Sequence, residues 1–330
     1  MDKEYYSSLA IVIPTKSRHD WVVKLIEYYT ALEYKGILVF VDSTKTSDYK
    51  NLKNLSKRLN FLYIHAPNES VHQALATGIE QLPKSVRYVI QTGDDDFICT
   101  DSLPKIVNFL DTNLDYNAAY GRAFSLGIKN TFKNSVKIVW CRKYWRGYEI
   151  RSDDYIVRMQ EILNNYLNLE FAVRRKESVL KGLKDMNRKA GKLNFSESTT
   201  LEILAVVDTV LAGKVKFIHT DYLLRGDHIG RPNREQKSLL SQYLLTNKFD
   251  ILSDYLVDKI PKLYKTNKKI YIEKVKELLL IYVGKSIIYK SVERKERNTI
   301  TGLRKRFINK IEGDINYLRL SKYLKIIQSK

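Results

Sequence analysis

The feature that most constrains the fold is an alternation of apolar strands and amphipathic helices over the first 115 residues. Four runs are apolar without polar alternation, as expected of strands buried on both faces: LAIVIPT, ILVFVDS, NFLYIHA and RYVIQT, at 9–15, 37–43, 60–66 and 87–92. Helical spacing of apolar residues follows the strands at 18–36, 48–59, 70–82 and 102–114. This order predicts an α/β fold with a mostly parallel sheet flanked by helices, and ligands bind such sheets at the carboxyl ends of the strands.

The pattern changes from about residue 118. Further strands are expected at 118–124, 136–145, 169–175 and from 214 into a turn near 228, with helices at 153–167, 177–186 and 200–213. After about residue 236 the chain is expected to be helical, and residues 241–330 hold 21 Lys and Arg against nine Asp and Glu. The sequence therefore predicts an α/β domain over 1–235 and a basic helical extension over 236–330.

Three consecutive aspartates, Asp94, Asp95 and Asp96, follow the fourth expected strand of a chain whose formal net charge is +20. Adjacent carboxylates disfavour one another's ionisation, so a divalent metal, a cationic partner or exposure to water must offset the repulsion. Thr15, Asp42 and His65 stand at the ends of the other expected strands and should lie at the same edge of the sheet. A metal site is the favoured interpretation, and an exposed acidic turn or a helix cap is the alternative.

The motifs IVIPTKSR, VDS, GDDDF and TLEILAVVDTVLAGKVKFI, in this order, resemble the inverting GT-A glycosyltransferases of the family 2 type. The resemblance covers residues 8–232. It implies a GT-A fold and transfer of a sugar, with inversion, from a nucleotide-sugar donor to a hydroxyl group. It also implies that Pro14, Thr15 and Asp42 contact the nucleoside, with Arg18 near enough to hold phosphate.

The resemblance further implies that GDDDF is a DxD motif, in which Asp94 and Asp95 contact the nucleotide sugar. Asp94, Asp96 and His228 are the metal ligands that it implies, for Mn²⁺ or Mg²⁺. A hard cation with oxygen ligands would neutralise the charge that develops on a departing diphosphate. Arg225 and Arg231, close to His228 in sequence, are candidates to neutralise phosphate.

Inverting transfer also needs a general base for the acceptor hydroxyl. Family members carry an acidic residue, often as Glu-Asp, at the start of a helix that ends in glycine about a dozen residues later. Glu202 precedes Gly213 by eleven residues and is the expected base, with Glu197 in reserve. Leu201 departs from the pattern because it replaces the preceding acid, so an ordinary helix glutamate is the alternative.

Two further segments bear on the resemblance. The stretch Ala74 to Gly78 lacks the asparagine of the family's Ala-Arg-Asn-x-Gly. LEFAVRRKESV resembles the segment that lines the acceptor side, where Arg174 and Arg175 are expected either to meet an anionic acceptor or to be surface charge.

Other classes of protein were weighed against this interpretation. A nucleotidyltransferase of related topology usually has a glycine-rich loop after the first strand, and IVIPTKSR has no glycine. A polymerase palm uses Gly-Asp-Asp in a hairpin, but the alternation before the motif disagrees. A nucleic-acid-binding protein would use the basic extension, in which no reading motif is recognised, and nucleic acid is therefore an unlikely partner.

Composition indicates the setting. There are two cysteines and no CxxC pair, which favours a reducing compartment. The chain shows neither a secretory signal pattern nor an apolar run long enough to span a bilayer. We expect a cytoplasmic enzyme, peripheral at the inner face of the membrane, that acts on a glycan or lipid-linked acceptor in bacterial surface polysaccharide synthesis. Contact with anionic lipid and a homo-oligomer are further expectations for the extension.

Overall fold

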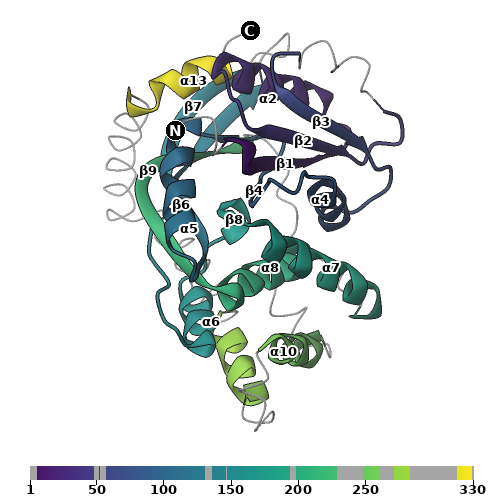
Figure 1. The fold of residues 1–330 in the computed structure, drawn as a ribbon, viewed down its shortest axis with the longest axis vertical. Coiled ribbons are helices and arrows are strands. Elements are labelled where there is room, and N and C mark those ends of the chain that lie inside the picture. The colour runs from purple at the N-terminus through teal and green to yellow at the C-terminus, as the bar shows by residue number, and fades with distance from the viewer. Residues whose placement is uncertain are drawn as a thin grey trace, which may run out of the picture.

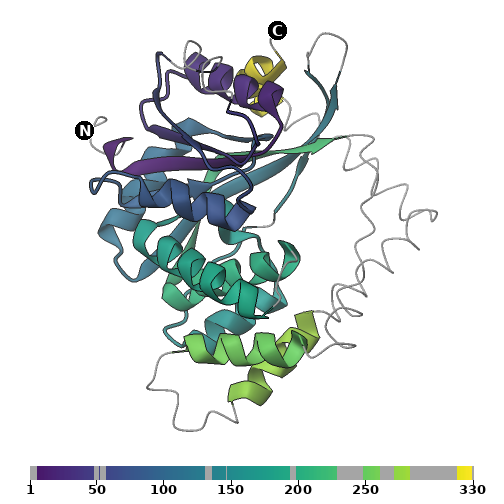
Figure 2. The same ribbon diagram turned by 90° about the vertical axis from the view of Figure 1, so that its right-hand side faces the viewer.

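The first half of the chain builds a parallel sheet. The computed structural model describes residues 6–47, 52, 57–130, 136–145, 147–193, 198–228, 248–260, 271–282 and 318–328. Strands β1 (Leu9–Thr15), β2 (Ile37–Asp42), β3 (Asn60–His65) and β4 (Tyr88–Gln91) lie parallel in the order β3-β2-β1-β4. Helix α2 (His19–Ala31) covers one face of these strands and α4 (Val71–Glu80) the other (Figures 1 and 2).

The second half extends the sheet with mixed pairings. Beyond β4 the order continues β8-β6-β9-β5, and β7 also pairs with β6. The bounds are β5 (Asp96–Ile98), β6 (Tyr116–Asn130), β7 (Val136–Lys143), β8 (Val173–Arg175) and β9 (Lys214–His228). Strand β9 runs parallel to β6 and antiparallel to β5. The predicted α/β fold is confirmed, and its parallel alternation is confined to the first four strands together with the β6–β9 pair.

The remaining helices lie against this sheet and one another. They are α5 (Leu103–Thr112), α6 (Tyr155–Asn164), α7 (Lys176–Leu193) and α8 (Ser198–Ala212), with short 3₁₀ turns at Thr100–Ser102 and Leu169–Phe171. Ser70 is the predicted N-cap of α4, and its hydroxyl accepts a bond from the Gln73 N–H while the Gln73 side chain caps the Ser70 N–H. Most of the helix expected at 48–59 lies outside the described residues.

Several sequence-based boundaries were wrong. Strand β6 continues to Asn130 instead of ending at 124, and α7 continues to Leu193 instead of ending at 186. The strand expected at 169–175 is a 3₁₀ turn followed by three strand residues, because the Asn168 side chain accepts the Glu170 N–H and turns the backbone there. Helix α2 ends at Ala31 rather than near Gly36, since Glu33 takes a left-handed φ of 51°. Residues 214–228 form one continuous strand instead of a strand and a turn.

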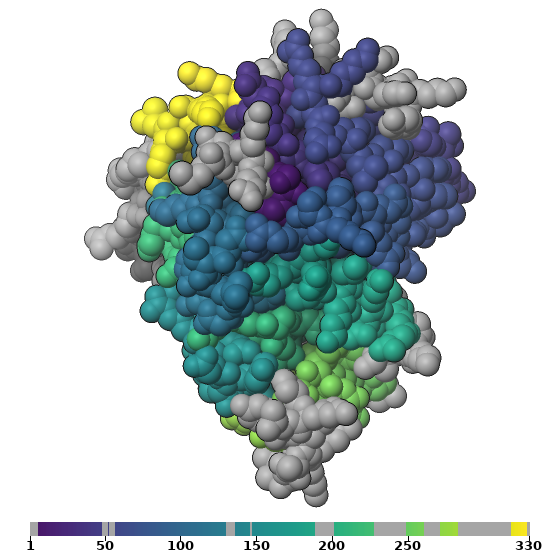
Figure 3. All heavy atoms as spheres, in the orientation of Figure 1, coloured from purple at the N-terminus to yellow at the C-terminus, as the bar shows by residue number. Residues whose placement is uncertain are grey.

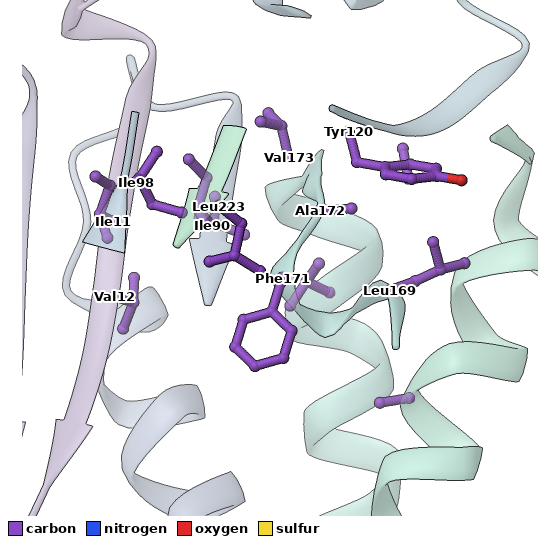
Figure 4. Packing of buried hydrophobic residues seen from close by; sticks show 14 of the residues in the cluster. Ile11, Val12, Ile90, Ile98, Tyr120, Leu169, Phe171, Ala172, Val173 and Leu223 are labelled. Carbon is purple, nitrogen blue, oxygen red and sulfur yellow. The ribbon is translucent and has the colours of Figure 1, made fainter. Parts of the chain in front are cut away.

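The core lies between the sheet and its helices. Ile11 and Val12 of β1, Ile90 of β4, Ile98 of β5 and Leu223 of β9 gather there, beside Phe171 (Figure 4). All but Phe171 are fully buried, and Phe171 is 8% exposed. Burial of this apolar surface fixes the relative positions of strand ends that are far apart in sequence.

The described residues of the C-terminal extension are helical and pack on the first 235 residues at two separate places. Helix α10 (Lys248–Lys259) and residues 271–282 lie at the α8 end of the molecule (Figures 1 and 2). Helix α13 (Ser321–Gln328), in yellow in Figure 3, packs on α2 and β7 at the other end. Within the described ranges no helix is long and apolar enough to cross a membrane.

Candidate active site

The carboxyl ends of the parallel strands converge, as predicted. Thr15, Asp42 and His65 are register partners across β1, β2 and β3. The Thr15 hydroxyl donates a 2.8 Å hydrogen bond to Oδ2 of Asp94, in the turn that follows β4. Pro14 is the register partner of Val41 in β2, and the pairing of β1 with β4 ends before it, at Val12. Proline therefore interrupts no hydrogen bond between β1 and β4.

Arg18 holds two of the three aspartates. Its guanidinium lies 3.0 Å from Oδ1 of Asp94 and 2.8 Å from Oδ2 of Asp95. The loop that carries it is set by Ser17, whose φ is 56° and whose N–H donates to the Thr44 hydroxyl at 2.8 Å. The Arg18 side chain is 28% exposed, so a ligand can reach its guanidinium from solvent.

Asp42 is held as an oriented acceptor at the end of β2. Its Oδ1 accepts the Thr44 N–H at 2.9 Å, and its Oδ2 accepts the Tyr63 hydroxyl of β3 at 2.5 Å. Thr44 is fixed in turn because its carbonyl is 2.8 Å from Nε2 of His65. Asp42, a predicted nucleoside contact, is therefore 5% exposed and oriented by two neighbouring strands.

Asp96 is the first residue of β5 and stands opposite Arg225 of β9. Its Oδ1 accepts the Gly226 N–H at 3.0 Å. Asp94, Asp95 and Asp96 are 5%, 9% and 4% exposed, so they do not form an open acidic turn. Burial raises the pKa of Asp94 to about 6, against the opposing effect of Arg18, and burial together with Asp95 raises the pKa of Asp96 to about 7.

The aspartates alone do not make a complete metal cage. Among the residues that the structure describes, no group of three or more His, Cys, Asp or Glu is placed to hold a metal ion. Their buried negative charge nonetheless suits a cation, because Arg18 is the one guanidinium seen in ion-pair contact with this turn among the described residues. Mg²⁺ commonly takes only one or two protein carboxylates and completes its shell with phosphate and water.

Glu202, the expected base, lies in α8, within electrostatic reach of Arg225. Its Oε1 accepts the Tyr166 hydroxyl at 2.5 Å. Burial and the charge of Glu170 raise the pKa of Glu202, while Tyr166, Arg225 and the more distant His72 lower it. The net shift is upward, which suits a group that must take a proton near neutral pH.

Arg225 connects the two halves of the site. Its guanidinium lies over the rings of Tyr144 and Phe171, at 4.9 and 5.1 Å from their centroids. The carboxylates of Asp96 and Glu202 both favour its charged form. The predicted phosphate-neutralising residue therefore interacts with both the aspartate turn and the expected base.

Sequence reasoning missed several members of this cluster. Tyr63, Tyr144 and Tyr166 hold Asp42, Arg225 and Glu202 respectively. Glu170 lies 3.5 Å from Nε2 of the buried His72, its Oε1 being the nearest atom. The only sequence signal was Glu170 in the mostly apolar run YLNLEF before β8, since an acidic residue between buried apolar neighbours needs a reason to be there.

Two arginines are structural and do not face an acceptor. Arg174 is 2% exposed, and its guanidinium binds Gln91, the Thr209 hydroxyl at 3.2 Å and the Glu170 carbonyl at 3.2 Å. Burial lowers the pKa of Arg174 to about 10. Arg175 donates to the Leu110 carbonyl at 2.8 Å, at the end of α5. Both expectations for this pair were wrong because β8 is an inner strand whose side chains meet other elements.

The side chains of three predicted site residues lie outside the described part of the structure. The backbone of His228 pairs with Ile128 at the end of β9, but its side chain lies outside the described part of the structure. Glu197 and Arg231 also lie outside the described residues.

Comparison with known proteins yields a structural likeness. No family model matches the chain, and no curated protein matches its sequence. The crystal structure of S. aureus TarS 1–349 matches with a TM-score of 0.53 and 9% identity, over 97% of this chain and 81% of that one. Its complex with UDP-GlcNAc matches with a TM-score of 0.56 and 11% identity, over 84% of this chain and 73% of that one. Its complex with UDP matches with a TM-score of 0.53 and 10% identity, over 97% of this chain and 89% of that one. At these identities the likeness shows a shared fold.

Proposed function

We propose that this protein is a glycosyltransferase that moves a sugar from a UDP-activated donor to an acceptor hydroxyl, with inversion at the anomeric carbon. The observation that carries the proposal is the cluster of Thr15, Arg18, Asp42 and the three aspartates at the carboxyl ends of β1, β2 and β4. The fold is shared with S. aureus TarS, whose structures include complexes with UDP and UDP-GlcNAc. Fold alone does not assign chemistry, so the site carries the argument.

The nucleoside would lie over β1 and β2. Asp42 offers an oriented carboxylate, and Thr15 and Pro14 form the adjoining floor. Arg18 can meet phosphate on its exposed side while it keeps Asp94 and Asp95 in place. Arg225 would approach the diphosphate from β9, because it faces Asp96 across the β5–β9 pair.

The residues fit a divalent cation, Mn²⁺ or Mg²⁺, provided that the donor supplies further oxygen ligands. Asp96 and Asp94 would hold the ion, and His228 is the third proposed ligand. When bound, the ion would neutralise charge on the departing diphosphate. Since no three-ligand protein set is present in the described residues, we expect metal and nucleotide to bind cooperatively.

Glu202 would take the proton of the acceptor hydroxyl. The Tyr166 hydroxyl orients its carboxylate, and the charge of Arg225 favours its ionised form. The deprotonated acceptor oxygen would then attack the anomeric carbon from the face opposite the diphosphate, and the bond to the diphosphate would break as the new bond forms. This single displacement is why inversion is proposed. The acceptor is proposed to be a glycan or lipid-linked glycan, presented at an anionic membrane surface that the basic extension would contact.

The test is turnover of a panel of UDP-sugars, with release of UDP measured in Mn²⁺, Mg²⁺ or EDTA. With UDP-GlcNAc and water as acceptor, we expect slow metal-dependent release of UDP, and the β-anomer of the free sugar should form first. Glu202→Gln should lower the rate by about 10²- to 10⁴-fold. Glu177→Gln, at an exposed glutamate of α7, is the matched control and should leave the rate unchanged. Failure of every UDP-sugar in the panel would refute the donor class.

A further inference from the structure

Tyr166, which orients the proposed base Glu202, packs on a residue of the C-terminal extension. Tyr166 donates its hydroxyl to Oε1 of Glu202. The Tyr166 ring packs on the ring of Tyr282, with centroids 5.2 Å apart and planes inclined by 51°. Tyr282 belongs to the helical residues 271–282 and is 8% exposed, so this contact is buried.

A second contact joins the extension to the helix that carries Glu202. Lys259, at the end of α10, lies 2.9 Å from Oδ2 of Asp208 in α8 and 3.3 Å from Oδ2 of Asp185 in α7. Asp208 is six residues, or less than two helical turns, along α8 from Glu202. Leu256 of α10 is fully buried. The extension therefore holds α8 by an ion pair and an apolar contact, apart from the contact at Tyr166.

We propose that α10 and residues 271–282 position the base: Tyr282 holds Tyr166 against Glu202, and Lys259 fixes α8 through Asp208. This inference rests on the proposed role of Glu202. It makes Tyr282 and Lys259 positioning residues that touch no substrate. It also gives part of the basic extension a task in catalysis, in addition to any contact with lipid.

Several charged groups face Glu202 and must stay constant in a test. They are Glu170 from the 3₁₀ turn, Arg225 from β9 and His72 from α4, with Tyr166 as the hydrogen-bond donor. The Tyr166 bond stabilises the ionised form of Glu202, so loss of the bond should raise the pKa of Glu202. Tyr282→Leu removes the ring that supports Tyr166 and leaves all four of these groups in the chain.

The experiment measures the Glu202 pKa by carbon NMR on protein labelled at the glutamate carboxyl carbon, with Glu202→Gln to assign the signal. The variants are Tyr166→Phe, Tyr282→Leu and the matched control Tyr323→Leu. Tyr323 is also a buried tyrosine of the extension, but it packs on Tyr28 of α2. We expect the pKa to rise most in Tyr166→Phe, to rise less in Tyr282→Leu, and to stay unchanged in Tyr323→Leu.

Turnover of UDP-GlcNAc gives a second readout. Tyr282→Leu should lower kcat by about tenfold or more with KM unchanged, and should move the acid limb of the pH profile upward. Tyr282→Phe, which keeps the ring, should restore both. If Tyr282→Leu does not fold, Tyr282→Met takes its place.

The outcomes separate the two claims. A Glu202 pKa in Tyr282→Leu equal to that of the wild type would overturn this inference, as would an equal rise in Tyr323→Leu. Neither result touches the proposed function. Absence of UDP-GlcNAc turnover in the wild type would count against the proposed donor, while the NMR titration would still decide whether the extension positions Glu202.

Discussion

At the residue scale, the site is a set of buried carboxylates near two arginines, Arg18 and Arg225. Asp94, Asp95 and Asp96 are at most 9% exposed. Burial raises the pKa values of Asp94, Asp96 and Glu202. Such groups cost stability and are retained where ligand binding or proton transfer needs them.

Glu202 should make stability depend on pH. Because its pKa in the folded protein is raised above the ordinary value of 4.5, the folded state keeps a proton that the unfolded chain loses. The contribution of this group to the free energy of unfolding therefore falls as pH rises from about 4.5 through the folded pKa. Glu202→Gln keeps the acceptor for Tyr166 and removes the titration.

Urea unfolding at pH 5 and pH 8 measures this effect. The free energy of unfolding of Glu202→Gln minus that of the wild type should be larger at pH 8 than at pH 5. The increase should be at most about 1.4 kcal/mol per unit of pKa shift. Glu177→Gln should show no such trend. An identical difference between Glu202→Gln and the wild type at both pH values would contradict the assignment.

Single residues differ in how far the sequence could reveal them. The aspartate triplet was predictable because adjacent like charges at a strand end need an explanation. Arg174 was misjudged, since nothing local distinguishes a buried arginine from a surface one. Tyr166 and Glu170 were missed because their partners, Glu202 and His72, are brought to them only by the tertiary fold.

At the element scale, two glycines allow the strands near the aspartates to approach closely. A Cβ on Gly226 of β9 would lie 2.5 Å from the backbone oxygen of Asp95. A Cβ on Gly93 would lie 2.9 Å from Oδ2 of Asp96, which a side-chain rotation can relieve. The clash at Gly226 is with a backbone atom, so no side-chain rotation can relieve it.

Gly226→Ala should therefore displace the aspartate turn and weaken UDP binding by about tenfold or more. A shift of this size corresponds to about 1.4 kcal/mol. Gly182→Ala in α7 is the control, because its Cβ would meet only the Asp208 side chain, at 3.0 Å. Calorimetric titration with UDP and Mn²⁺ measures both variants, and equal affinities in Gly226→Ala and the wild type would contradict the account.

The cap of α4 is a purely structural prediction. Ser70→Ala removes the hydroxyl that accepts the Gln73 N–H at 3.4 Å. The free energy of unfolding should fall by about 1 kcal/mol. Urea denaturation measures this loss, and UDP affinity should not change. A stability equal to that of the wild type would mean that water replaces the cap.

Elements were predictable where one physical pattern governs them. Strands β1, β2 and β4 are buried on both faces, so their apolar runs were plain in the sequence. Strand β3 has an equally apolar sequence, but it lies at the edge of the sheet and is only partly buried, so the expectation of burial on both faces was wrong there. The segment 169–175 was not, because the Asn168 side chain competes with the strand for the Glu170 N–H. The pairing of β5 with β9 depends on residues more than 120 positions apart and has no local signal.

At the scale of the whole molecule, the end of the chain returns to the N-terminal domain. Leu320, Leu324 and Ile327 are fully buried against α2 and β7. Arg319 and Lys322 add ion pairs to Asp221 and Asp101, both at 2.9 Å. The sequence predicted a basic helical tail, but no pattern in it indicated this docking site.

Leu324→Ala should destabilise the protein by about 2–5 kcal/mol, because it leaves a cavity under α13. Leu318→Ala is the control, since Leu318 is 75% exposed. Denaturant unfolding compares the two variants. If both variants lose a similarly small free energy of unfolding, α13 does not contribute to the core.

The central claim is that the aspartate turn binds a nucleoside diphosphate together with a metal ion. Calorimetric titration with UDP, in Mn²⁺ and in EDTA, tests it on the wild type, on Asp96→Asn and on Asp101→Asn. Asp101 is the matched control because its side chain is 66% exposed and pairs with Lys322. The account predicts Mn²⁺-dependent binding in the wild type and in Asp101→Asn, and its loss in Asp96→Asn. Binding of UDP that is equally tight in EDTA, or that survives in Asp96→Asn, would contradict it.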